Sequence, residues 1–284
     1  MKRLTIRNIQ KMKTDGEPIT MLTAYDATSA RIAESAEIPM LLVGDTLGMV
    51  VQGHDSTIPV KLEHMIYHAE IVTRVTTRSL VVGDLPFMTY SVSPEQALKN
   101  SGKLMQQAGV SAVKLEGGEN MAPTIKRITE AGIPVMAHIG LTPQSVNQFG
   151  GFRVQGKQLN SARQLLRDAE AVQEAGAFAV VLELVPAPLS QIITHKLDIP
   201  TIGIGAGIGC DGQVQVFHDI LALFDDFIPK HTKRYANLNE LMLAAVQRYH
   251  AEVREGEFPT DDNSFAMSDD VLDQLRDEVL HAHR

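Results

Sequence analysis

Short apolar runs that end on an ionisable residue constrain the fold of this chain more than any other feature of its sequence. Four of these runs end on a carboxylate, at Asp45, Asp84, Glu116 and Glu183, and a fifth ends on His138. Runs this short, rich in Val, Leu and Ile and bounded by glycine or polar residues, are typical of strands buried on both faces. In parallel sheets the carboxyl end of such a strand lies beside the crevice that α/β folds use for chemistry.

Helical patterns alternate with these runs along most of the chain. Asp26, Ser93, Asn120 and Ser161 stand where helices are expected to begin, and three helical segments end in Ala-Gly directly before the next apolar run. Eight strands alternating with helices in a chain of 284 residues favour a (β/α)8 barrel over an open sheet. The expected strands cover residues 19–25, 40–44, 80–83, 111–116, 133–140, 178–183, 199–205 and 214–220.

No shift in composition marks a domain boundary before the C-terminal end. We therefore expect a single (β/α)8 barrel domain over residues 1–265, with a helix at its N-terminus, and a C-terminal helical extension over residues 266–284. Within the extension, apolar residues recur at helical spacing from Val271 to Val279, which predicts an amphipathic helix. A solvated, frayed tail is the alternative.

Charge and composition exclude several classes of protein. A net charge of −8 argues against a nucleic-acid-binding protein, which needs a basic surface. No apolar stretch has the length of a membrane span, and the basic N-terminal segment lacks the apolar core of a secretory signal. A single cysteine, Cys210, excludes an intrachain disulfide and a cysteine-rich metal cluster. The expected location is the cytoplasm.

Three of the run-ending acids lie on successive expected strands. Neighbouring strands of a barrel end close together, so Asp45, Asp84 and Glu116 are expected to share one site. Three carboxylates would repel one another there unless a cation offset their charge. Oxygen ligands without cysteine favour Mg²⁺. The alternative is that each acid only caps the helix that follows it.

Lys114, Glu183 and His138 complete the set of candidate residues. Lys114 precedes Glu116 by two positions, so both side chains lie on one face of a strand, where the lysine could bind an anionic substrate or form a Schiff base; we favour anion binding. Glu183 stands apart from the three acids and suits a general base, the alternative being a carboxylate paired with a cation. His138 is interpreted as a residue that orients the substrate rather than as a metal ligand.

A glycine-rich segment at residues 203–209 is not a dinucleotide-binding fingerprint. It is not followed by the start of a helix with the acidic partner that such a site requires. The glycines either let the backbone approach an anionic or planar ligand or allow tight packing.

The chain also resembles the ketopantoate hydroxymethyltransferase family over roughly residues 3–265. Position 46 is Thr where that family usually has Ser, which keeps the hydroxyl, and the segment after Phe265 extends beyond the usual end of the family. The stretches that carry the resemblance are VGDTLGMVVQGHDSTIPV (43–60), GDLPFMTY (83–90), VKLEGGE (113–119), HIGLTPQSVNQFGGFRVQG (138–156) and PTIGIGAGIGCDGQ (200–213).

This resemblance implies a (β/α)8 barrel that transfers a hydroxymethyl group from 5,10-methylenetetrahydrofolate to 3-methyl-2-oxobutanoate. The products would be ketopantoate and tetrahydrofolate, in the first step of pantothenate biosynthesis. It also implies a homo-oligomer, specifically a decamer. Carried over by position, Mg²⁺ would be held by Asp45, Asp84 and Glu116, the keto acid would be bound by Asp45, Thr46, Asp84, Lys114 and His138, and Glu183 would be the base.

Two other functions remain open from the residues alone. One is a Mg²⁺-dependent lyase or mutase that acts on 2-oxo acids without folate. The other is a non-catalytic, metal-dependent keto-acid-binding protein, in which Glu183 has only a structural role. A transferase requires a one-carbon donor, whereas the lyase or mutase does not. An enzyme exchanges the proton at C3 of the keto acid, whereas a non-catalytic binding protein does not. The sequence identifies no residue that must hold a pterin.

Overall fold

The computed structural model describes residues 2–224 and 228–281. Contacts between residues divide the chain into two compact units, Met1–Ala236 and Asn237–Arg284. The boundary expected after residue 265 falls inside the second unit, because the long helix that follows residue 236 makes its contacts there. The assignment of the catalytic domain to residues 1–265 stays a prediction.

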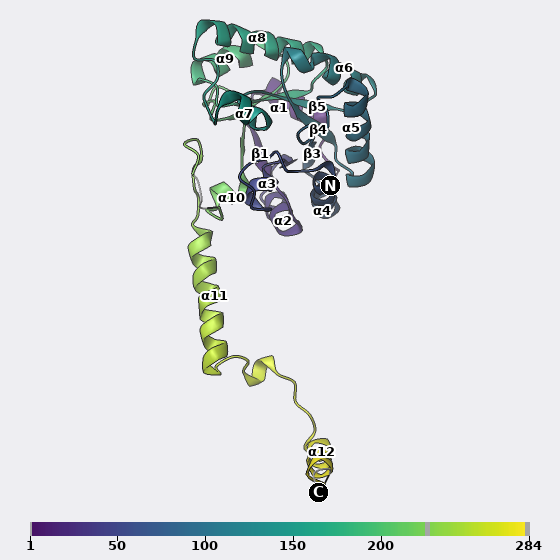
Figure 1. Cartoon of the computed structure of the whole chain (residues 1–284), viewed down its shortest axis with the longest axis vertical. Coiled ribbons are helices and arrows are strands. Elements are labelled where there is room, and N and C mark those ends of the chain that lie inside the picture. The colour runs from purple at the N-terminus through teal and green to yellow at the C-terminus, as the bar shows by residue number, and fades with distance from the viewer. Residues whose placement is uncertain (1, 225–227, 282–284) are drawn as a thin grey trace. The chain divides into compact units, whose positions relative to one another are not determined.

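Eight parallel strands close into a barrel in the first unit, with each strand paired to its neighbours in chain order and β8 paired to β1 (Figure 1). The predicted (β/α)8 fold is confirmed. The strands are β1 (Ile19–Thr23), β2 (Met40–Val43), β3 (Leu80–Asp84), β4 (Ala112–Glu116), β5 (Val135–Gly140), β6 (Ala179–Glu183), β7 (Thr201–Ile204) and β8 (Gly212–Gln215).

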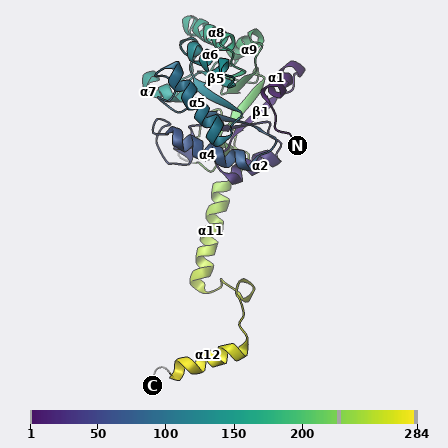
Figure 2. The ribbon, with the colours of Figure 1, turned by 90° about the vertical axis from the view of Figure 1, so that its right-hand side faces the viewer.

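Helices follow the strands and lie on the outside of the barrel (Figure 2). Capping side chains fix two of their starts as predicted: Asp26 accepts a hydrogen bond from the backbone N–H of Ser29, and Ser93 accepts one from that of Gln96. The elements of this unit are α1 (Ile6–Asp15), α2 (Ala27–Ser35), α3 (Leu47–Val50), α4 (Leu62–Val75), α5 (Pro94–Ala108), η1 (Glu119–Met121), α6 (Ala122–Glu130), η2 (Pro143–Ser145), α7 (Val146–Phe149), α8 (Leu159–Glu174), α9 (Ala187–Lys196) and α10 (Phe217–Ile220).

Two expected elements differ from the structure in an informative way. The prediction of a strand over residues 214–220 is wrong over most of its length, because β8 ends at Gln215 and α10 begins at Phe217. The backbone N–H of Phe217 donates a hydrogen bond to the Thr23 hydroxyl. Helix α8 begins at Leu159, before the expected cap Ser161. The Ser161 hydroxyl instead accepts a hydrogen bond from the backbone N–H of Gln158, which is the inner position of a capping box.

The inside of the barrel is closed at its amino end. Ile9 of α1 is fully buried and packs in one cluster with Ile19, Leu80 and Phe178, which lie at or just before the starts of strands. A helix that covers this end leaves the carboxyl ends of the strands as the open end of the barrel, where the run-ending acids lie.

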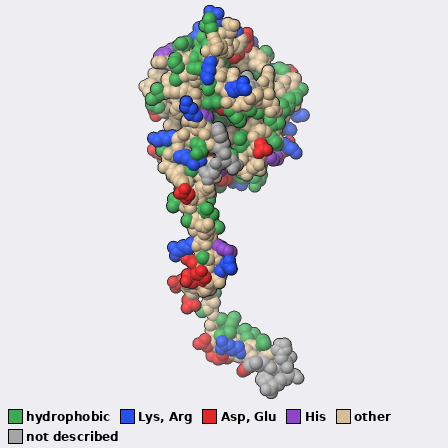
Figure 3. Space-filling view, turned by 60° about the vertical axis from the view of Figure 1, so that its left-hand side comes forward, with side chains coloured by type: hydrophobic (Ala, Val, Ile, Leu, Met, Phe, Trp, Pro, Cys, Tyr) green, Lys and Arg blue, Asp and Glu red, His purple; other side chains and the backbone are tan. Residues whose placement is uncertain are grey.

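The second unit contains α11 (Leu238–Glu255), η3 (Asp261–Asn263) and α12 (Asp269–His281). The helix predicted in the C-terminal extension is thus present as α12, and residues 282–284 of that prediction lie outside the described residues. Several large apolar side chains of α11 are exposed, among them Leu241, Val246 and Tyr249 (Figure 3). Among the described residues, no helix has the length and apolar character needed to span a membrane.

Candidate active site

Charged side chains replace apolar ones at the carboxyl ends of three adjacent strands. Alternate residues of β3, β4 and β5 point into the barrel. Near the amino ends of these strands they are apolar, and toward the carboxyl ends they are Asp84, Lys114, Glu116 and His138. All four are between 1% and 5% exposed. The strand register sets Asp84 beside Lys114 and Glu116 beside His138. The alternation of side chains along each strand therefore brings these predicted residues together.

Lys114 forms the centre of this buried charge cluster. Its Nζ lies 2.7 Å from Oδ2 of Asp84 and 4.0 Å from Oε1 of Glu116. Burial lowers the pKa of Lys114, but the nearby carboxylates of Asp84, Glu116 and Asp45 raise it further, so its pKa lies above the ordinary value. A charged ammonium group at this position favours the binding of an anionic substrate.

Asp45 reaches the same cluster from the segment after β2. It is 3% exposed, and its backbone N–H donates to Oδ2 of Asp84 at 3.3 Å. Burial raises the pKa of Asp45 well above its usual value, and the charges of Asp84 and Glu116 raise it further. Burial likewise raises the pKa of Asp84, although Lys114 opposes the shift. Both carboxyls lie where additional positive charge would stabilise their ionised forms.

The predicted metal ligands lie in one cluster but do not form a ready-made metal site. Among the described residues, no group of three or more His, Cys, Asp or Glu side chains is arranged to hold a metal ion. The ammonium group of Lys114 contacts two of the three acids instead. Two oxygens of the cluster, Oδ1 of Asp84 and Oε1 of Glu116, are buried without a hydrogen-bond partner. Hard, unsatisfied oxygen donors are the kind that a divalent cation such as Mg²⁺ binds.

His138 lies between the acid cluster and Glu183. Its Nδ1 is 3.5 Å from Oε1 of Glu116 and its Nε2 is 3.2 Å from Oε2 of Glu183, although neither contact has the near-linear geometry of a hydrogen bond. Burial lowers the pKa of His138, but the two carboxylates raise it further, to about 9. The expectation that Glu183 stands apart is thus corrected: only β5 separates β4 from β6, and His138 touches both carboxylates.

Glu183 ends β6 and lines an open cavity, with a side chain that is 15% exposed. Its backbone position depends on Gly140 at the end of β5. Gly140 has a φ of +94°, and a Cβ added there would lie 2.3 Å from the carbonyl oxygen of Glu183. The next residue, Leu141, donates its N–H to that same oxygen at 2.8 Å. Only glycine permits this approach, which brings the ends of β5 and β6 together.

Gln144 and Tyr90 belong to the site, although neither was predicted from the sequence. The Gln144 side chain donates to Oδ2 of Asp45 at 2.8 Å, and its backbone N–H donates to Oε2 of Glu116 at 3.0 Å. The Tyr90 hydroxyl donates to Oε1 of Gln144 at 2.8 Å. A signal existed, since both residues lie shortly after strands that end in candidate residues. Their side-chain directions, however, depend on loop conformations.

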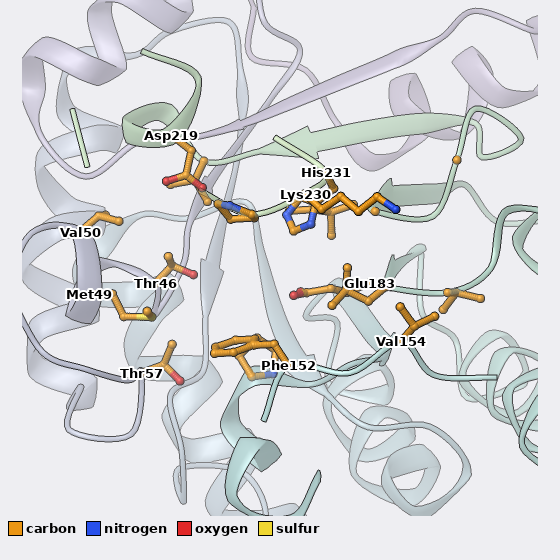
Figure 4. A pocket seen from close by; sticks show the side chains of 18 of the residues that line it. Thr46, Met49, Val50, Thr57, Phe152, Val154, Glu183, Asp219, Lys230 and His231 are labelled. Atoms are coloured by element: carbon orange, nitrogen blue, oxygen red, sulfur yellow. The ribbon is translucent and has the colours of Figure 1, made fainter. Parts of the chain in front are cut away.

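A cavity of about 610 Å³ opens beside this cluster, within the size range of small-molecule sites (Figure 4). Thr46, predicted to bind substrate, lies on its wall together with Glu183, and its hydroxyl points into the space. The wall also includes Met49, Val50, Thr57, Phe152, Val154, Pro186, Gly205, Gly207, Asp219, Lys230 and His231. The glycine-rich segment predicted to approach a ligand thus contributes part of the wall.

Comparison with known proteins identifies relatives over nearly the whole chain. A sequence model described as ketopantoate hydroxymethyltransferase matches residues 3–261. The 3-methyl-2-oxobutanoate hydroxymethyltransferase of Chloroflexus aurantiacus is 60% identical over 265 residues, which cover 93% of this chain and 94% of that protein. The protein of the same name from Dehalococcoides mccartyi is 56% identical, with 98% of this chain and 100% of that protein covered.

Solved structures with the same fold are much more distant in sequence. A 2,3-dimethylmalate lyase of the PEP mutase/isocitrate lyase superfamily has 17% identity and a TM-score of 0.59, with 99% of this chain and 98% of that chain covered. A phosphonopyruvate hydrolase, solved in complex with oxalate and Mg²⁺, has 14% identity and a TM-score of 0.58, with 98% of each chain covered. Similarity at this level supports the barrel fold and nothing more.

Proposed function

The chain belongs to the ketopantoate hydroxymethyltransferase family, and from this membership we propose how its site performs the reaction. The enzyme transfers a hydroxymethyl group from 5,10-methylenetetrahydrofolate to 3-methyl-2-oxobutanoate and so forms ketopantoate for pantothenate biosynthesis. The observation that carries the proposal is the contact of His138 with both Glu116 and Glu183. It joins a cluster of buried charges to one carboxylate that faces a cavity large enough for substrates.

The acid cluster is proposed to hold Mg²⁺ through Asp45, Asp84 and Glu116. Three buried carboxylates face one ammonium group, and two of their oxygens have no hydrogen-bond partner among the described residues, so a cation would satisfy both charge and coordination. A divalent cation bound there would stabilise negative charge on the keto oxygen of the substrate.

The keto acid is proposed to bind beside this cluster. Lys114 is a charged ammonium group that offsets the negative charge of the substrate, and the hydroxyl of Thr46 on the cavity wall offers it a hydrogen bond. Asp45 and Asp84 are proposed to contact the substrate as well as the metal, since Thr46, the residue next to Asp45, lies on the cavity wall. This arrangement would orient the C3–H bond of the keto acid toward Glu183.

Glu183 is proposed to take the C3 proton, and His138 to hold Glu183 in position. A carboxylate at the cavity wall that contacts an imidazolium group is fixed in direction, as a general base requires. Loss of the proton leaves an enolate, whose C3 forms a bond to the one-carbon unit. Both bonds that join the methylene carbon to the folate nitrogens N5 and N10 break, and water supplies the hydroxyl oxygen. The proton taken from C3 and one proton of the water end on these two nitrogens, and tetrahydrofolate leaves.

Proton exchange at C3 tests these assignments. In D₂O with Mg²⁺ and no folate, the enzyme should exchange the C3 proton of 3-methyl-2-oxobutanoate, as followed by NMR. Glu183→Gln should slow both exchange and product formation by about 10²–10⁴-fold, as expected for loss of a general base. The matched control, Glu174→Gln, removes an exposed carboxylate at the end of α8 and should change neither rate.

The outcomes of this experiment separate the alternatives. If deuterium never enters C3 and Glu183→Gln behaves like the parent enzyme, the assignment of the base is wrong. If exchange occurs but no hydroxymethyl product forms with methylenetetrahydrofolate, the transferase assignment fails instead, and a lyase, mutase or keto-acid-binding protein becomes the better description.

We also propose that the chain acts in the cytoplasm as a homo-oligomer. The exposed apolar side chains of α11 support an assembly, because a helix with such a surface is stabilised by packing against another chain. The decamer implied by the resemblance remains part of this proposal.

A further inference from the structure

The cavity beside Glu183 has chemically different ends. Asp219 of α10 lies on the side formed by Thr46 and Thr57, and the carboxylate of Glu183 approaches from the opposite side (Figure 4). The exposed side chain of Lys230 also lines the cavity, and its amine points away from the Asp219 end. The long apolar space therefore has an acid at one end, Glu183 along its wall and a lysine directed toward the other end.

Thr57, at the Asp219 end, is buried without a hydrogen-bond partner. It is 2% exposed, and its Oγ1 makes no hydrogen bond to any described residue. Buried polar atoms are rarely left in this state, so Thr57 points to a polar ligand. Asp219 is 9% exposed and lines the same cavity. Burial raises the pKa of Asp219 to about 6, although Arg234 opposes the shift.

Between the two ends the wall is suited to a flat ring. The aromatic ring of Phe152 lies below the space and the imidazole of His231 lies above it in the view of Figure 4. Burial lowers the pKa of His231, although the charge of Glu183 raises it, so the imidazole is neutral at physiological pH. Met49 and Val50 add apolar surface nearby. Stacking against such groups stabilises planar heterocycles.

We propose that this end of the cavity binds the reduced pterin ring of the folate substrate. The carboxylate of Asp219 accepts hydrogen bonds from the ring N3–H and the 2-amino group, and the Thr57 hydroxyl bonds to the same polar edge. The one-carbon unit, which bridges N5 of the pterin and N10 of the p-aminobenzoyl group, then lies near Glu183. The glutamate carboxylates extend toward Lys230. This inference rests on the proposed function and adds residues that bind folate.

Binding measurements on three variants test the proposal without requiring turnover. The probes are tetrahydrofolate and 6-methyltetrahydropterin, which lacks the p-aminobenzoylglutamate, titrated by calorimetry with Mg²⁺ and the keto acid present. Asp219→Asn should raise the Kd of both probes by about 10- to 100-fold, because a charge-assisted hydrogen-bond pair is lost. Lys230→Met should raise the Kd of tetrahydrofolate but not that of 6-methyltetrahydropterin. The control Glu174→Gln alters an exposed carboxylate at the end of α8 and should change neither Kd.

The C3 exchange reaction distinguishes this proposal from the proposed function. Asp219→Asn should exchange the C3 proton at the parent rate, because folate is not needed for that step. The pterin site is wrong if Asp219→Asn leaves both Kd values unchanged, if it abolishes exchange as well, or if Lys230→Met weakens both probes equally. If the parent enzyme binds tetrahydrofolate and forms no product from methylenetetrahydrofolate, it is the transferase function that fails.

Discussion

Nε2 of His138 lies 3.2 Å from Oε2 of Glu183, while the other ring nitrogen faces Glu116 at 3.5 Å. An imidazole placed in this way fixes the direction of Glu183 and couples it to the acid cluster. The ring is 2% exposed, so it is shielded from solvent where it faces the two carboxylates. The position of the proposed base therefore depends on a residue of the neighbouring strand.

Replacement of His138 by Gln should lower kcat by about 10- to 100-fold with little effect on the KM for folate. Glu183 loses the contact that orients it, and misplacement of a catalytic group by even a small distance has effects of this size. Steady-state kinetics and the C3 exchange rate should fall together. A loss of product formation with normal exchange would contradict the positioning role.

Gln144→Leu should raise the Mg²⁺ concentration that gives half-maximal activity by about 10- to 100-fold, as is common for residues that orient metal ligands. The change removes the bond to Asp45 and leaves the Tyr90 hydroxyl without its acceptor. Activity measured against Mg²⁺ concentration gives the shift. Tyr90→Phe is the matched variant. It keeps the Gln144 amide in place and should raise the required Mg²⁺ concentration by a smaller factor than Gln144→Leu does. Equal effects of the two substitutions would argue for a general loss of structure.

The sequence predicted the residues of the site better than it predicted their contacts. Asp84, Lys114, Glu116 and His138 could be grouped because strands alternate their side chains between two faces, so position along a strand gives the face. Gln144 and Tyr90 lie in loops, where the direction of a side chain depends on packing that no periodicity encodes. Asp219 was missed for a different reason: a strand was expected over residues 214–220, whereas Phe217–Ile220 form the helix α10.

Gly140→Ala should destabilise the protein by about 2–4 kcal/mol, because the new methyl group overlaps the carbonyl oxygen of Glu183 and the residue is held at a positive φ. Gly132→Ala is the control: it has a similar φ of +87° but nothing within 4 Å of the added Cβ, so only backbone strain of about 1 kcal/mol is expected. Urea denaturation of the two variants measures the difference. Equal losses would show that the close approach to Glu183 is unimportant.

Oligomer formation should depend on the apolar surface of α11. Val246→Glu places a charge among the exposed apolar side chains of this helix, and a buried charge in an interface between copies is costly. Light scattering after size-exclusion chromatography should then show a smaller species than the parent enzyme. Gln247→Glu adds the same charge at the next position and should leave the mass unchanged. An unchanged mass for Val246→Glu would exclude this part of α11 from the interface.

The carboxylate of Glu34 at the end of α2 should make stability depend on pH in the acid range. It accepts backbone hydrogen bonds from Thr77, Arg78 and Ser79, and a further one from the Ser79 hydroxyl. Partial burial raises the pKa of Glu34, but these hydrogen bonds lower it further, from 4.5 to about 2. Because the folded-state pKa lies below the unfolded value, the stabilisation is fully present above pH 4.5 and is lost as the pH falls toward 2.

Glu34→Gln should therefore lower the free energy of unfolding at pH 7 by about 1–2 kcal/mol, a value reduced for the solvent that screens this partly exposed group. The difference in the free energy of unfolding between the parent protein and the variant should decrease steadily below pH 4.5, as measured by urea denaturation at several pH values. Glu17→Gln, which changes an exposed carboxylate, should show no gap at any pH. A gap for Glu34→Gln that stays constant down to pH 3 would mean that its hydrogen bonds do not require the ionised carboxylate.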